Sequence, residues 1–320
     1  MTKRKSGLGL LAAVAFALAG APTMAADLNY YKAPPSEPAP TLDIHGFFDV
    51  SFKNDYITPR GLLVTNTGLT VQILSGIVFD LYKDRNGFIN KVSIVGGTWN
   101  DLWSEQRHPL VGAWNEFDWF VGMDVLFAQN WKFGVQYVQF LSPPGNFHAE
   151  NNVEFTLAYS DKWMGWPVAL NPYVKLFWAV SGDSTVVVGD QGKTYDVEIG
   201  IVPTLELAKY GAPIVLTAPT WVTVGPSTYW NRGITGCGVS PFTPCAASNA
   251  GVFSTGITGK VPLAFIPARF GKWYADAGFQ YYHIINDSLL LAQTFTGTAA
   301  SFNTAHREIG VVFAGFGFGF

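Results

Sequence analysis

The sequence has little charge and little cysteine, and beyond its first 25 residues it has no long apolar segment. Charged residues make up 13% of the 320 residues, about half of what soluble domains carry. Two cysteines exclude a disulfide-dense scaffold, and the lack of a basic block excludes a nucleic-acid partner. With 34 glycines and 19 prolines, long helices are disfavoured. An apolar chain rich in turns indicates an all-β or membrane protein.

The N-terminus has the pattern of a secretory signal peptide. Three basic residues at 3–5 precede an apolar stretch at 7–21, and small residues follow. We expect a cleaved signal peptide at 1–25, a Pro-rich periplasmic tail at 26–41 and one β-barrel domain at 42–320. An exported apolar chain without a spanning helix crosses a membrane as a closed barrel, because lipid offers backbone groups no hydrogen-bond partner. The expected location is the bacterial outer membrane.

Alternation of apolar and polar residues predicts the strands. Between residues 42 and 53, apolar side chains occupy the even positions and mostly polar ones the odd positions, as in a sheet with one wet face. Twelve such segments can be placed, an even number as bacterial barrels require. They lie near 42–53, 69–81, 88–98, 117–127, 131–141, 151–160, 168–180, 195–207, 213–224, 252–265, 273–286 and 308–320. We predict a transmembrane antiparallel β-barrel, monomeric or loosely associated, with lipid against its apolar face.

The predicted connections alternate in length, as they do in outer-membrane barrels. Short periplasmic turns include Asn86-Gly87, a hairpin signal. Longer connections near 53–68, 99–115, 142–150, 181–193, 225–251 and 287–306 are expected outside the cell. Aromatic residues fall near both ends of the strands, as interfacial girdles do. They are Tyr82, Trp131, Trp163, Trp166, Trp273 and Tyr274 at the inner side and Tyr56, Trp99, Trp103 and Trp114 at the outer side.

The last strand carries a specific signal. Phe316, Phe318 and Phe320 alternate with glycine at the end of the chain. This pattern resembles the recognition strand that outer-membrane proteins present to the barrel-assembly machinery. The resemblance implies that this machinery is a partner through the Phe320 strand.

Two further segments resemble known outer-membrane proteins. Ala-Asp-Leu at 26–28 and Lys-Ala-Pro-Pro at 32–35 look like the opening of alphaproteobacterial outer-membrane proteins. The segment 48–61 resembles a family of proteobacterial outer-membrane proteins of unknown function, in which Ser-Asp-Tyr is followed by Arg-Gly after strand one. Here Asn54 stands in place of the serine. The resemblance implies a barrel but no activity, and Arg60 either folds inward toward lumen carboxylates or stays an exposed loop cation.

Complete catalytic and metal-binding constellations are lacking in the sequence. None of the five histidines has a serine two positions later, as an outer-membrane phospholipase would need. The segment around Ser184 is similar to the nucleophile block of Gly-Asp-Ser-Leu esterases, but no Asp-x-x-His accompanies it. We expect no enzyme, no cofactor and no metal site. Cys237 and Cys245 are expected to form a disulfide in an outer loop, because an exported chain meets an oxidising compartment.

The polar faces of the strands predict an acidic lumen. The acids there are Asp49, Asp80, Glu116, Asp118, Asp124, Glu154, Asp196, Glu198, Glu206 and Asp276, against Lys53, Lys91, Lys132, Lys175 and Lys260. Such charges either fill the barrel as a salt-bridged core or line a narrow channel for small polar or cationic solutes. Inward Trp114, Phe140 and Phe177 would narrow that channel or stack on a solute. We favour the channel, with a structural or ligand-binding barrel as the alternative and an esterase less favoured.

Overall fold

The computed structural model describes residues 42–105, 107–182, 194–226, 229–230 and 248–320. The predicted signal peptide and periplasmic tail lie outside these residues. Cys237, Cys245 and Ser184 lie outside them too. The disulfide, the cleavage site and the tail therefore stay predictions.

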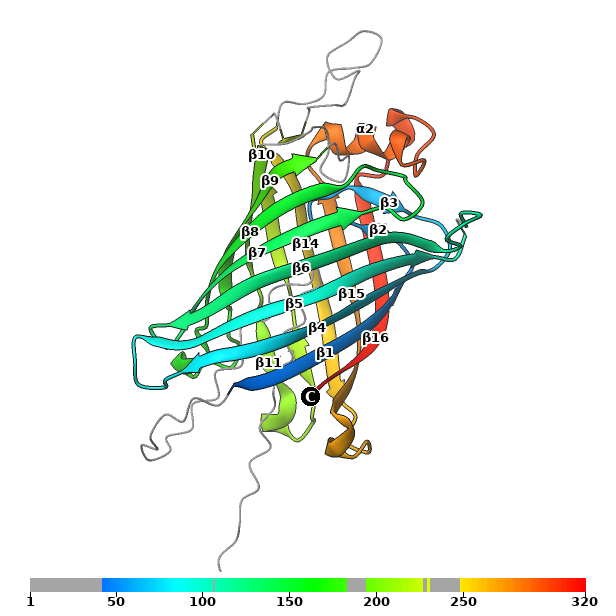
Figure 1. Ribbon diagram of the computed structural model, residues 1–320. Coiled ribbons are helices and arrows are strands. Elements are labelled where there is room, and N and C mark those ends of the chain that lie inside the picture. The colour runs from blue at the N-terminus through cyan, green and yellow to red at the C-terminus, as the bar shows by residue number, and fades with distance from the viewer. Residues whose placement is uncertain (1–41, 106, 183–193, 227–228, 231–247) are drawn as a thin grey trace, which may run out of the picture.

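Twelve antiparallel strands form one closed barrel, as the alternation predicts (Figure 1). In chain order they are β1 (Asp43–Lys53), β4 (Thr70–Lys83), β5 (Ile89–Trp103), β6 (Trp114–Phe127), β7 (Trp131–Leu141), β8 (Glu150–Tyr159), β9 (Pro172–Gly182), β10 (Thr194–Ile201) with β11 (Thr204–Glu206), β12 (Val215–Thr217) with β13 (Thr220–Val224), β14 (Ala250–Pro262), β15 (Lys272–Ile284) and β16 (Glu308–Gly319). β1 pairs with β4 and β16, and β14 pairs with β15, so the sheet closes on itself. Closure gives edge groups a partner that lipid could not supply.

The strand β16 shows why glycine and phenylalanine alternate near the end of the chain. A Cβ on Gly317 would lie 2.4 Å from the Tyr274 hydroxyl oxygen, and one on Gly315 would lie 2.7 Å from the Asp276 Oδ1. The glycines therefore leave room inside the barrel for these two side chains. Phe318 lies on the opposite face and stacks on Trp273, with 4.6 Å between the ring centroids.

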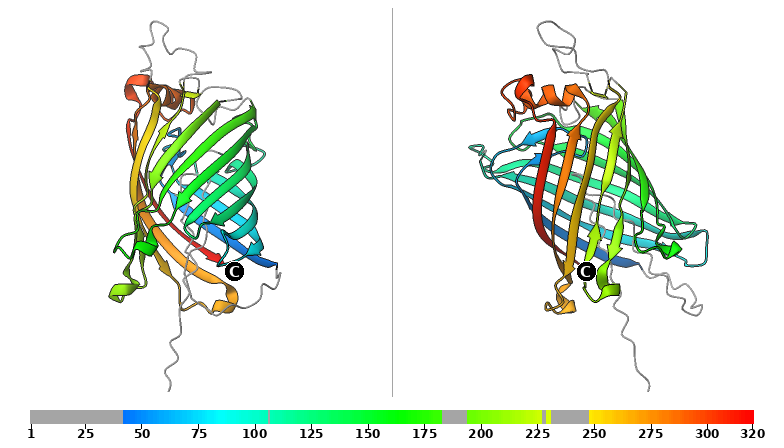
Figure 2. Two further views of the ribbon diagram at one scale, coloured as in Figure 1. Left: turned by 90° about the vertical axis from the view of Figure 1, so that its left-hand side faces the viewer. Right: turned by 180° about the vertical axis from the view of Figure 1, so that it is seen from behind.

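The two ends of the barrel differ in the length of their connections (Figures 1 and 2). We call the end that carries the helix α2 (Asp287–Phe295) the helix end, and the end where Phe320 lies the C-terminal end. The C-terminal end has the short turns, with the 3-10 helices η1 (Lys162–Met164), η2 (Leu207–Tyr210) and η3 (Ala268–Phe270). The helix end has the long connections, including η4 (Phe302–Thr304). This alternation agrees with the predicted pattern.

Two predicted strands are interrupted by proline. Pro203 separates β10 from β11, and Pro219 separates β12 from β13. Proline has no N–H to donate to a sheet ladder, so the pairing breaks where each one stands. The carbonyl oxygens compensate, because Pro203 accepts from Ala218 N at 2.8 Å and Pro219 accepts from Gly256 N at 3.0 Å.

The helix α2 replaces part of a predicted loop. Asn286 begins it, with the side-chain oxygen accepting from Ser288 N at 2.9 Å. Its residues 288–293 are buried over the end of the barrel. In the described part of the chain, no helix is long and apolar enough to cross a membrane.

The outer aromatic girdle is only partly as predicted. Trp114 is exposed beside Phe117, which places it on the outer surface and corrects its prediction as a lumen residue. Trp131, Trp163 and Trp166 are exposed near the C-terminal end, as expected. In contrast, three aromatics expected at the outer interface are buried inside the barrel. They are Tyr56, Trp99 and Trp103.

Candidate functional site

The connection between β1 and β4, residues 54–69, folds into the barrel, and we call it the inserted segment. It contains the short hairpin of β2 (Tyr56–Ile57) and β3 (Leu63–Thr65) at the helix end (Figure 1). Its tip is a tight turn in which Gly61 N donates to Thr58 O at 2.9 Å. Gly61 has a φ of +93°, which favours glycine. The indole Nε1 of Trp221 donates to Pro59 O at 3.3 Å and ties the tip to the wall.

Arg60 points from this tip into the lumen and is buried. Its guanidinium carbon lies 5.3 Å from the ring centroid of Phe140 and 5.0 Å from that of Phe177. Burial alone would lower the pKa of Arg60, but the nearby Tyr229 hydroxyl and the Glu150 carboxylate raise it above its usual value. Of the two alternatives left by the sequence, the structure therefore has the inward one.

Buried acids surround the inserted segment on the inner face of the wall. Asp101, Glu116 and Asp118 come from β5 and β6, Glu150 and Glu154 from β8, and Asp196 and Glu198 from β10. Some have a donor, as when Tyr173 donates to Glu198 at 2.6 Å and Lys175 pairs with Glu154 at 2.8 Å. Among the described residues, Oδ1 of Asp118 has no hydrogen-bond partner, and the carboxyl group of Asp196 lies beside the Tyr229 hydroxyl.

Several charges nearer the C-terminal end are paired. The buried Asp80 accepts from Ser93 at 2.7 Å and lies within 2.9 Å of both the Lys83 and the Lys91 ammonium groups. Asp124 pairs with Lys132 at 2.9 Å. Asp49, which is half-buried, accepts from the Tyr274 hydroxyl at 2.6 Å. Asp80 and Asp124 in this half of the lumen are thus held by ion pairs.

An apolar layer closes the helix end above these acids. Leu289 and Leu290 of α2 pack with Trp230 and with Leu62 and Leu63 of the inserted segment in one buried cluster. Trp230 and Leu289 have no exposed surface. The described conformation is therefore occluded at this level.

Ten of the fifteen charged residues predicted on the polar faces fall into these two groups. The acidic group near the inserted segment contains Glu116, Asp118, Glu154, Asp196 and Glu198 together with Lys175, and the paired group contains Asp49, Asp80, Asp124 and Lys132. Their role in conduction stays a prediction. Asp101 and Glu150 were missed, although both are buried. Asp101 lies at a β-bulge between β5 and β6, and Glu150 is the first residue of β8.

Asp43, His45 and Asp80 bring three possible metal ligands within 4.8 Å of one another. The ammonium group of Lys83 lies 2.6 Å from Asp43 and 2.9 Å from Asp80, and that of Lys91 lies 2.8 Å from Asp80. Two lysines thus already neutralise these carboxylates. The cluster is an ion-pair network at the C-terminal end rather than a prepared metal site.

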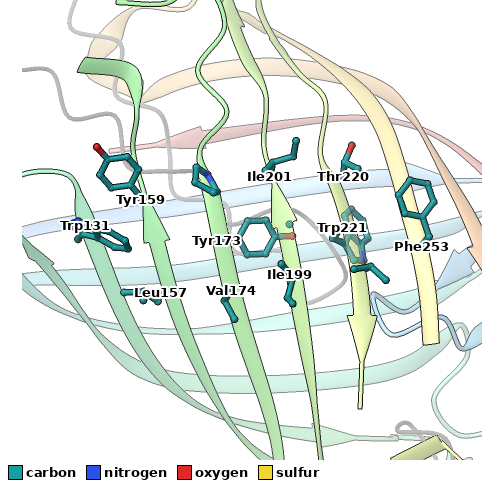
Figure 3. A pocket seen from close by; sticks show the side chains of 13 residues that line it. Trp131, Leu157, Tyr159, Tyr173, Val174, Ile199, Ile201, Thr220, Trp221 and Phe253 are labelled. Atoms are coloured by element: carbon teal, nitrogen blue, oxygen red, sulfur yellow. The ribbon is translucent and has the colours of Figure 1, made fainter. Parts of the chain in front are cut away.

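Two hollows in the described structure differ in where they open. A lumen cavity of about 10 Å³ is lined by Asp124, Gln136, Glu154 and Lys175 among others, and it has room for about one water molecule. A larger hollow of about 560 Å³ is lined by apolar side chains such as Leu157, Val174 and Ile199 (Figure 3). These side chains are exposed on the outer surface of the barrel, so this hollow faces the membrane rather than the lumen.

Comparison with known sequences identifies no family for this chain, whereas comparison with solved structures finds outer-membrane proteins. No protein-family model matches the chain, and no curated protein matches it. An outer membrane channel from Pseudomonas putida F1 is similar in structure, with 10% identity, a TM-score of 0.47 and coverage of 90% of this chain and 100% of that one. The transport unit of the autotransporter AIDA-I from Escherichia coli has 11% identity, a TM-score of 0.40 and coverage of 86% and 88%.

A bacterial polysaccharide outer membrane secretin is also similar, with 10% identity, a TM-score of 0.42 and coverage of 87% of this chain and 97% of that one. Similarity at this level carries no inference about function. The resemblance of segment 48–61 to a family of outer-membrane proteins, and the alphaproteobacterial origin, stay predictions.

Proposed function

We propose that this chain is a bacterial outer-membrane channel for small polar or cationic solutes. The described conformation is its closed state, and the inserted segment must shift before a solute passes. The outer-membrane location is supported by the signal-like N-terminus and by the apolar outer surface of a closed barrel.

One observation carries this proposal, the excess of acid among the buried charges. Among the described residues the buried acids of the lumen are Asp80, Asp101, Glu116, Asp118, Glu150, Glu154, Asp196 and Glu198, and the buried or nearly buried bases are Arg60, Lys132 and Lys175. A barrel that only needed a filled interior would be more stable with apolar side chains or matched pairs, because a buried unmatched charge costs free energy. Acids inside low-dielectric walls create a negative potential that attracts cations.

A non-conducting barrel is the second candidate, and the occlusion favours it. Leu63, Trp230 and Leu289 are almost completely buried across the helix end. If the apolar layer never opens, the acids serve only to hold the inserted segment and Arg60 in place.

Single-channel recording in planar bilayers under a potassium chloride gradient separates these functions. We expect brief openings whose reversal potential is shifted from zero toward the equilibrium potential of potassium. A reversal potential shifted toward the equilibrium potential of chloride would show that the acidic lumen does not determine the selectivity. Absence of any conductance at all voltages, from protein that shows heat-modifiable migration, would establish the non-conducting barrel instead.

A further inference from the structure

Arg60 occupies a site with the chemistry of an organic-cation receptor. Its guanidinium lies between the rings of Phe140 on β7 and Phe177 on β9, at 5.3 and 5.0 Å from their centroids. The faces of aromatic rings carry negative charge density and attract cations, most strongly where water is excluded. Phe177 also contacts the Lys175 ammonium group, 4.3 Å from the ring centroid. The rings belong to the wall, whereas Arg60 comes from the inserted segment.

Carboxylates complete the negative surroundings of this site. Glu150, Glu154 and Asp196 all act on the Arg60 charge, and all three are buried. Among the described residues, however, Nε and Nη1 of Arg60 lack a hydrogen-bond partner. Arginines that serve structure usually hold a carboxylate through two parallel hydrogen bonds. Arg60 is instead held by ring faces and by the surrounding field, which suits exchange with another cation.

The tip that carries Arg60 is tied to the wall by few polar contacts in the described structure. The bond from Trp221 Nε1 to Pro59 O measures 3.3 Å, near the limit for a hydrogen bond. The tip's other backbone bonds join Thr58 to Gly61 and Leu62, within the turn itself. Because the turn is internally bonded, its own hydrogen bonds do not depend on contact with the wall.

We propose that Phe140, Phe177, Glu150 and Asp196 form a binding site for the guanidinium or alkylammonium group of a solute, and that Arg60 fills this site as an internal competitor in the closed state. The proposal deepens the proposed function and rests on it for the passage of the solute. The binding chemistry itself can be tested without conduction. A solute cation that takes the place of Arg60 releases the tip of the inserted segment.

The test removes the Arg60 side chain and measures whether a cation from solution binds in its place. In the Arg60→Ala protein in detergent, titration calorimetry should show saturable binding of methylguanidinium, whereas the neutral methylurea should not bind. Adding Phe177→Leu should weaken binding about tenfold or more, because one of the two ring faces is lost. Adding Phe47→Leu, a buried phenylalanine outside the site, should leave binding unchanged.

Folded Arg60→Ala protein that shows no saturable binding would overturn the proposal, as would equal effects of Phe177→Leu and Phe47→Leu. If Arg60→Ala and Arg60→Ser both fail to assemble, the variants are refolded in the presence of methylguanidinium or methylurea. Assembly that is restored by methylguanidinium but not by methylurea supports the site. If methylguanidinium does not restore assembly, the proposal is wrong. Binding without any conductance in the wild type would retain the site and reject the channel. The two proposals therefore fail separately.

Discussion

The acids in the two halves of the lumen differ in whether they form ion pairs. Toward the C-terminal end, Asp80 and Asp124 are paired with lysines at 2.8–2.9 Å. Toward the helix end, Asp118 and Asp196 are buried, and among the described residues neither forms an ion pair within 4 Å. Paired charges hold strands together, whereas unmatched buried charges reduce stability. The C-terminal half therefore contains charge pairs that stabilise it, whereas the helix half contains Asp118 and Asp196, whose burial no ion pair offsets among the described residues.

Removing the tip of the inserted segment should have the largest effect. Replacing Thr58–Leu62 by two glycines deletes Arg60 and the turn that crosses the lumen. We expect single-channel conductance to rise on the order of tenfold, because the narrowest part of the path is widened. Recordings in planar bilayers measure this change.

A matched deletion at the other end serves as the control. Shortening the turn at 84–88 between β4 and β5 removes a similar stretch away from the lumen constriction. Its conductance should equal that of the wild type. If both deletions leave conductance unchanged, the inserted segment is not the constriction.

Stability should respond in opposite directions to the same substitution in the two halves. Asp80→Asn removes the charge that Lys83 and Lys91 share, and we expect the free energy of unfolding to fall by about 2 kcal/mol. Asp118→Asn removes a buried charge with an unpartnered oxygen, so stability should be unchanged or slightly higher. Urea unfolding in lipid vesicles, followed by tryptophan fluorescence, measures both values. A larger loss for Asp118→Asn would reverse the comparison.

Ion selectivity should depend on the helix half. The double variant Asp118→Asn/Asp196→Asn removes two buried carboxyl groups and should lower the potassium-to-chloride permeability ratio about twofold. The double variant Asp124→Asn/Lys132→Gln removes one ion pair and leaves the net charge unchanged, so the ratio should stay the same. Reversal potentials under a salt gradient give both ratios. Equal shifts in the two variants would show that pore selectivity does not follow the buried charge.

The last comparison concerns the single hydrogen bond between the wall and the tip of the inserted segment. Trp221→Phe removes the hydrogen bond to Pro59 O, which contributes about 1 kcal/mol. The open probability should rise about fivefold, since this is the corresponding change in an equilibrium constant. Trp273→Phe removes a similar bond to Phe270 O near the C-terminal end and should not change gating. More frequent openings in Trp273→Phe alone would contradict the model of a tip-controlled gate.

Most of the fold could be predicted from local sequence patterns. Strand positions, strand number and the alternation of long and short connections follow from a two-residue period and turn residues, which act over short stretches of chain. The inward position of Trp99 and Trp103 was missed because the predicted strand 88–98 ended too early, whereas β5 continues its alternation to Trp103. Asp101 was missed for the same reason. Trp114 was placed on the wrong face because the β-bulge opposite Asp101 shifts the period by one residue.

The helix α2 could not be predicted from its own residues. Leu289, Leu290 and Leu291 form an apolar run without helical periodicity, and all three are buried because the helix lies across the barrel end. Its helical state is stabilised by the Asn286 cap and by packing on Trp230 and the inserted segment. Such burial depends on the whole barrel and leaves no amphipathic pattern.

The sequence by itself determined a membrane-compatible barrel, because each strand records in its alternation which face meets lipid. Only the tertiary structure decided that the lumen is occluded and that Arg60 lies inside it. The contacts responsible join Arg60 to Phe140 and Phe177, and Pro59 to Trp221, residues far apart in the chain. A cation in a loop is as stable in water as inside the barrel unless aromatic rings and buried carboxylates surround it there. Closure of the barrel brings these groups together around Arg60.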